Sequence, residues 1–115
     1  PVSTIQTKLN LEEVNLNNVK TLASLYPSLS VGFSNHYNGH LACLGAIALG
    51  AECVEFHITE DRTMYGSDQA SSIENYHQLL VGIRSLEKML GDGVKRVYDT
   101  EKPIIEKLRN TDDTI

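Results

Sequence analysis

The chain has 115 residues, the size of one ordinary domain. Its net charge of -5, without a Lys/Arg cluster, argues against a nucleic-acid partner, and no apolar run approaches the roughly 18 residues of a membrane span. Hydrophobic residues make up 41% and charged residues 22%, as in a globular protein. Cys43 and Cys53 lie in apolar stretches, and no signal-peptide pattern is present, so we expect buried, reduced thiols in the cytoplasm.

The hydrophobic pattern predicts helices that alternate with two strands. In chain order these are a helix over Leu16–Leu25 capped by Asn15, a strand over Leu29–Ser34, a helix over Leu41–Leu49, a strand over Glu52–Ile58, a long helix opened by Ser71 and a short helix over Lys102–Arg109. The long helix has the clearest boundaries, because Ser71 and Glu74 match a capping box and Gly91 follows its last apolar residue. The helix over 41–49 is apolar nearly all round and should be buried.

The order of these elements predicts an α/β fold with parallel strands. The connection between the two strands is long, as a right-handed parallel crossover requires. Two parallel strands alone cannot form a sheet buried on both faces. We therefore expect the chain to be the tail of a larger α/β sheet or barrel, and its start at Pro1 instead of Met agrees with a chain cut from a longer protein.

Polar side chains with catalytic or metal-binding chemistry follow one face of each predicted strand. Because side chains alternate, Ser34 and His36 share a face of the first strand, and Glu55 and His57 share a face of the second. Ligands of such folds bind at the carboxyl ends of the strands. His36 and His57 could therefore meet at one metal ion, with Glu55 as a further ligand or a holder of bound water. The alternative is that each histidine is a satisfied polar group at a barrel rim, and spacing does not decide between the two.

Two further histidines and one loop are weaker candidates. His40 follows His36 by four residues, but the residues between them predict a turn instead of a chelating helix. His77 lies on the long helix without a partner and is interpreted as a surface or packing residue. The polar loop over 59–70 is either a substrate contact or a solvated turn. Ser34 either donates to a phosphate or bonds the backbone.

Several stretches of the sequence resemble the last third of the synthase barrel in the sialic acid synthase (N-acetylneuraminate synthase) family. They are VGFSNH at Val31–His36, LGAIALGAECVEFHIT at Leu44–Thr59, DRTMYGSDQASS at Asp61–Ser72 and VGIRSLEKMLGDGVKRV at Val81–Val97. The combination of a strand-end Ser-x-His, a strand-end Glu-x-His and a Gly-x-Asp loop is specific, although one motif alone would not be. Members of that family condense phosphoenolpyruvate with an N-acyl amino sugar, such as N-acetylmannosamine, to make a nine-carbon ulosonic acid.

The resemblance implies the C-terminal part of a (β/α)8 TIM barrel, with the two strands as its seventh and eighth. Residues 1–97 would belong to the barrel, and residues 98–115 would form a C-terminal tail or the start of a linker. It implies a C–C bond-forming transferase in the intact protein, which would be a cytoplasmic homodimer. The isolated chain would be inactive, because the phosphate-binding lysines of that family come from earlier strands.

Individual roles also follow from the resemblance. His36 and His57 match the divalent-metal ligands, with Mn commonly used and Mg or Co as alternatives. Ser34 matches a contact to phosphoenolpyruvate, Glu55 matches a catalytic residue on the sugar side, and Asp68 matches a sugar-binding residue in the Gly-x-Asp loop.

Three positions depart from the family pattern. Asn35 stands where many members have Asp, Phe56 replaces a common Arg or Lys, and Gln69 replaces a frequent His beside Asp68. The last change leaves the acceptor sugar open, so a related synthase of the legionaminic or pseudaminic type is an alternative. A barrel fragment without catalytic activity is the other alternative. Phosphate-binding lysines on earlier strands would favour an enzyme, and their absence would favour this alternative.

Overall fold

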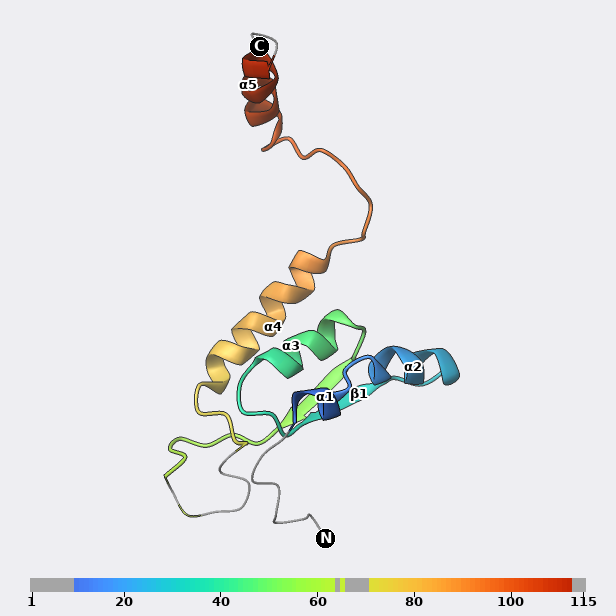
Figure 1. Cartoon of the computed structure of the whole chain (residues 1–115), viewed down its shortest axis with the longest axis vertical. Helices are drawn as coiled ribbons and strands as arrows, with labels where there is room; N and C mark the ends of the chain where they lie inside the picture. Colours follow the sequence, from blue (N-terminus) through green and yellow to red (C-terminus); the bar gives the residue numbers. More distant parts are fainter. Residues whose placement is uncertain (1–9, 64, 66–70, 113–115) are drawn as a thin grey trace.

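Two parallel strands and five helices form the part of the chain that the computed structural model describes, namely residues 10–63, 65 and 71–112, without the side chains of 110–112 (Figure 1). They are α1 (Leu11–Val14), α2 (Asn18–Leu25), β1 (Gly32–Asn35), α3 (Leu41–Ala48), β2 (Cys53–Phe56), α4 (Tyr76–Leu90) and α5 (Lys102–Asp112). The predicted order of helices and strands is confirmed, with the short α1 as an addition. No helix in the described ranges is long and apolar enough to cross a membrane.

The sheet is parallel, as the long connection between its strands predicted. β1 pairs with β2 in a register that places Gly32 opposite Cys53 and Ser34 opposite Glu55. Helix α3 connects the two strands and packs on one face of the sheet, with α4 alongside it (Figure 1). The opposite face is open, since Gly32, Ser34, Cys53 and Glu55 are all exposed on it. Within the described residues, the helices therefore cover only one side of the sheet.

The core lies between the sheet and the helices and consists of two clusters. One contains Cys43, Ile73, Leu79 and Ile83, and the other contains Val19, Ala46 and Ala51. Helix α3 contributes to both, because its small residues allow close packing on two sides. The expected burial of α3 is confirmed for Ala42, Cys43 and Ala46, whereas Leu41 at its start is 70% exposed.

The predicted capping box at the start of the long helix is wrong. Helix α4 begins at Tyr76 and is preceded by an isolated parallel bridge between Ile73 and Ile58. The Glu74 carboxylate accepts a hydrogen bond from the backbone N–H of Arg62 at 3.0 Å instead of capping the helix. A long-range pairing has therefore replaced the local cap that the sequence favoured.

Three smaller predictions are also corrected. Cys53 is exposed on the open sheet face, whereas Cys43 is fully buried and burial raises the pKa of its thiol to about 11; both are free thiols. Asn15 does not cap α2, because it adopts a left-handed conformation (φ 48°) after α1. Both strands are shorter than predicted, since each has one neighbour and the ladder covers only their paired residues.

The segment after α4 runs without regular structure from Gly91 to Tyr98 and leads to α5, which lies apart from the other elements in Figure 1. Asp92 and Arg96 form an ion pair of 2.8 Å in this segment. In α5, Ile104 and Leu108 are each 60% exposed. The predicted start of the last helix at Lys102 is confirmed, and the helix continues to Asp112.

Leu79 is expected to be a main support of this core. Its side chain is fully buried against α3, so Leu79→Ala should lower the free energy of unfolding by about 2–5 kcal/mol through lost burial and a residual cavity. Leu80→Ala is the matched control, because Leu80 is 48% exposed and its loss should cost about 1 kcal/mol or less. Denaturant unfolding of the full-length variants measures both. Equal losses would contradict the assigned packing of α4.

Candidate functional site

The open face of the sheet carries the predicted polar residues. Ser34 and Glu55 are register partners on β1 and β2, and both are exposed. Phe33, Val54 and Phe56 point to the other side and pack against the helices. The predicted division of each strand into a polar and an apolar face is therefore confirmed.

His36 and His57 lie side by side, each at the first position after the carboxyl end of its strand. Their ring centroids are 6.0 Å apart and their planes are inclined by 54°. The Nε2 atom of His57 is also 3.9 Å from the Glu55 carboxylate, at the outer range of an ion pair. The prediction that the two imidazoles share a face and a strand-end level is confirmed, and Glu55 belongs to the same group.

The backbone around His57 is held by the residues that precede α4. The carbonyl of His57 accepts a hydrogen bond from the N–H of Ile73 at 2.8 Å, and the N–H of Thr59 donates to the carbonyl of Ile73 at 3.1 Å. Arg62 reinforces this pairing, because its Nε donates to the carbonyl of Ser72 at 2.9 Å. The end of β2 is therefore tied to a second segment directly beside the imidazole.

The separation of the two imidazole rings fits part of a metal site. At a bond length of roughly 2.1 Å, the centre of an imidazole ring lies roughly 3 Å from its metal, so two rings on one ion are at most roughly 6 Å apart. The observed 6.0 Å falls at this limit. Among the described residues no group of three His, Cys, Asp or Glu side chains is arranged to hold an ion. The pair would therefore need at least one ligand from water, substrate or another part of the protein.

The other predicted candidates have structural partners. The Nε2 atom of His40 is 2.9 Å from the Asn75 side-chain oxygen, which connects the start of α3 to the residue before α4. His77 is exposed, and its ring centroid lies 4.4 Å from that of Tyr76, with the two planes inclined by 37°. The interpretation of His77 as a surface or packing residue agrees with its contact.

The loop after β2 is described only in part. Asp61 accepts two hydrogen bonds from Thr63, from its N–H at 2.8 Å and its hydroxyl at 2.7 Å, and these bonds lower the pKa of the Asp61 carboxyl. Asp61 is thus the anchor of a turn. Asp68, the predicted sugar contact, and Gln69 lie outside the described residues.

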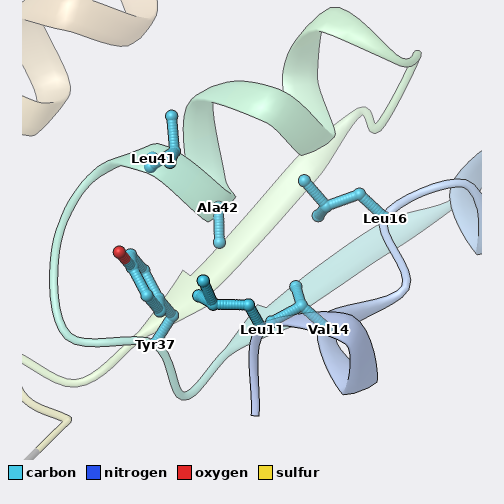
Figure 2. A pocket seen from close by; sticks show the side chains of 6 residues that line it. All are labelled: Leu11, Val14, Leu16, Tyr37, Leu41 and Ala42. Atoms are coloured by element: carbon cyan, nitrogen blue, oxygen red, sulfur yellow. The ribbon is translucent and has the colours of Figure 1, made fainter. Parts of the chain in front are cut away.

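Two features near the site add to what the sequence predicted. Asn35, directly before His36, is 1% exposed and forms hydrogen bonds to Tyr37. A hollow of about 230 Å³ lies near the carboxyl end of β1, and Figure 2 shows the side chains that surround it. It is lined by Leu11, Val14, Leu16, Tyr37, Leu41 and Ala42. Its lining is almost wholly apolar, which separates it in character from the histidine and carboxylate group.

A parallel strand pair with a hydroxyl, a carboxylate and two imidazoles at one edge has the architecture of a ligand-binding end of an α/β enzyme. Residues 6–95 match the NeuB family, and the chain belongs to that family.

Relatives and a solved structure agree with this assignment. The chain is 36% identical over 87% of its length to human N-acetylneuraminate-9-phosphate synthase, and covers 28% of that protein. It is 37% identical over 86% of its length to N,N'-diacetyllegionaminic acid synthase of Campylobacter jejuni, and covers 30% of it. The crystal structure of N-acetylneuraminic acid synthetase from Leptospira borgpetersenii superposes with a TM-score of 0.71 at 35% identity, over 86% of this chain and 35% of that one. The chain therefore spans about a third or less of the length of these relatives.

Proposed function

We propose that this chain supplies the seventh and eighth strands of the barrel in a phosphoenolpyruvate-dependent ulosonic acid synthase. The observation that carries the proposal is the pair of imidazoles, 6.0 Å apart at adjacent strand ends, with the Glu55 carboxylate 3.9 Å from His57. The remaining strands would cover the open sheet face and bring the phosphate-binding lysines. The intact protein would work in the cytoplasm as a homodimer.

The reaction joins the enol carbon of phosphoenolpyruvate to the aldehyde carbon of an open-chain N-acyl amino sugar. Water adds at the carbon that carried the phosphate ester, and inorganic phosphate leaves. A divalent ion held by His36 and His57, Mn²⁺ or alternatively Mg²⁺ or Co²⁺, would polarise the aldehyde oxygen toward attack.

The side chains of the open face have separate tasks in this proposal. Ser34, on β1, donates a hydrogen bond from its hydroxyl group to phosphoenolpyruvate. Because Glu55 lies opposite Ser34 in register and next to His57, we assign to its carboxylate the exchange of a proton with the sugar oxygen or with the attacking water. His36 and His57 would each offer a ring nitrogen to the ion.

The acceptor sugar stays open between close alternatives. The sequence identity is nearly the same to human N-acetylneuraminate-9-phosphate synthase (36%) and to C. jejuni N,N'-diacetyllegionaminic acid synthase (37%). A panel of N-acetylmannosamine, its 6-phosphate and the diacetylated sugars tests the proposal through phosphate release from phosphoenolpyruvate. We expect release with one class of these sugars. No release with any of them would favour a barrel without catalytic activity.

Asp68→Ala tests the proposed sugar contact. In the full-length enzyme we expect the KM for the amino sugar to rise by about tenfold or more, as after loss of a hydrogen bond to a carboxylate of roughly 1.5–3 kcal/mol. The bound metal content should stay unchanged, because Asp68 is assigned to the loop and not to a strand end. Loss of metal with an unchanged KM would reverse the two roles.

A further inference from the structure

Asn35 is a buried polar residue next to a proposed metal ligand. It is 1% exposed and lies on the helix-facing side of the sheet, opposite Phe56 in register. That side is turned away from Ser34 and the open face, so the Asn35 side chain cannot reach a substrate there. A buried amide is costly unless it is hydrogen-bonded, so its hydrogen bonds indicate what it contributes.

Both hydrogen bonds of the Asn35 side chain go to the main chain of Tyr37. Its Nδ2 donates to the Tyr37 carbonyl at 2.9 Å, and its Oδ1 accepts from the Tyr37 N–H at 3.2 Å. The two bonds therefore span His36, the residue between them. Side-chain bonds of this kind stabilise a local turn of the backbone.

This turn supplies a restraint that the sheet does not. The paired register of β1 and β2 ends at Asn35, so the ladder stops one residue before His36. His57, by comparison, has its carbonyl bonded to the N–H of Ile73. At a ring separation of 6.0 Å, close to the upper limit for a shared ion, a small rotation of the backbone at His36 would move the two imidazoles out of range.

We propose that Asn35 is a positioning residue, which directs the imidazole of His36 toward His57 by clamping the peptide groups of Tyr37. This inference rests on the proposed function, since it presumes that the two histidines share a metal ion. Asn35 itself touches neither metal nor substrate.

The test measures Mn²⁺ affinity of full-length variants by calorimetry, together with hydrogen exchange at the Tyr37 amide. Asn35→Leu keeps the shape of the buried side chain and removes both hydrogen bonds, so we expect affinity to fall by about 10–100-fold, the range for losing a partner that orients a ligand. The Tyr37 amide should exchange faster. Asn35→Asp retains an acceptor for this amide and should lose less affinity than Asn35→Leu.

Ile83→Ala is the control for lost stability alone, because Ile83 is buried in the same core on α4 and has no bond to the turn. It should destabilise the fold and leave Mn²⁺ affinity within about threefold, unlike the 10–100-fold loss of an orienting partner. The inference is overturned if Asn35→Leu binds Mn²⁺ like the wild type, or if Ile83→Ala loses as much affinity. His36→Ala distinguishes failure of the proposed metal site from failure of the proposed role of Asn35. Unchanged Mn²⁺ affinity in His36→Ala overturns the metal site itself. Weak Mn²⁺ binding by His36→Ala together with normal binding by Asn35→Leu overturns only the role of Asn35.

Discussion

His36→Ala and His57→Ala in the full-length protein are each expected to lower Mn²⁺ affinity by at least about 100-fold, beyond the roughly 10–100-fold of losing an outer-shell partner. Each substitution removes one of the two proposed nitrogen donors, whose rings are 6.0 Å apart at adjacent strand ends. The synthase activity should fall with the metal content. Calorimetric titration of the metal-free protein and analysis of bound metal after purification measure the effect.

His77→Ala is the matched control for these two variants. His77 is an exposed histidine on α4 whose ring contacts Tyr76, so its removal takes away an imidazole of the same chemistry from outside the site. Its Mn²⁺ affinity should equal that of the wild type. If His36→Ala and His57→Ala also bind normally, the imidazole pair is a packing feature of the strand ends and the metal assignment is wrong.

Glu55→Gln is expected to lower kcat by about 10²–10⁴-fold, the range for a side chain that transfers a proton in the transition state. The amide has the shape of the carboxylate and cannot take up a proton at neutral pH. The KM for phosphoenolpyruvate should change little, because the proposed function assigns the binding of that substrate to Ser34 and to other parts of the protein. Steady-state phosphate release with both substrates varied gives the two constants.

Glu52→Gln provides the comparison for this variant. Glu52 is an exposed glutamate one residue before β2, and the same charge is removed there without a neighbouring histidine. It should keep a kcat within about twofold of the wild type, as expected of a substitution that leaves proton transfer intact. A normal kcat in Glu55→Gln would show that Glu55 only lines the site, and a decrease confined to metal binding would make it a ligand.

The strand pairing and the polar face were predictable because they depend on short-range rules. Alternation along a strand divides Ser34 from Phe33, and a long connection implies parallel strands, so the polar face that carries Ser34 and Glu55 followed from the sequence. Their pairing in register was seen only in the structure. The closeness of His36 and His57 followed in turn, since both stand one residue beyond strands that are neighbours.

The parts that were not predictable depend on contacts between distant segments. Ser71 and Glu74 have the spacing of a capping box, but Ile73 pairs with Ile58 and Glu74 bonds to Arg62, so α4 begins only at Tyr76. A local rule was overridden by tertiary pairing.

The burial of individual side chains was also not predictable from the sequence. Cys53 was expected inside because its neighbours in sequence are apolar, yet its strand parity places it on the open face with Glu55. Asn35 was noted as a departure from the family pattern, but nothing in its sequence surroundings indicated that its side chain would bond across His36 to Tyr37. Both outcomes depend on which face is covered, and that is set by α3 and α4.

The central claim is that the imidazole pair and Glu55 form one part of a metal-dependent synthase site which other strands complete. The most direct measurement is phosphate release from phosphoenolpyruvate with an N-acyl amino sugar and Mn²⁺, made on the full-length protein and on the 115-residue chain in parallel. We expect sugar-dependent release from the full-length protein that disappears on chelation of the metal, and none from the 115 residues. Turnover by the chain alone, or full-length turnover that survives His57→Ala, would contradict the claim.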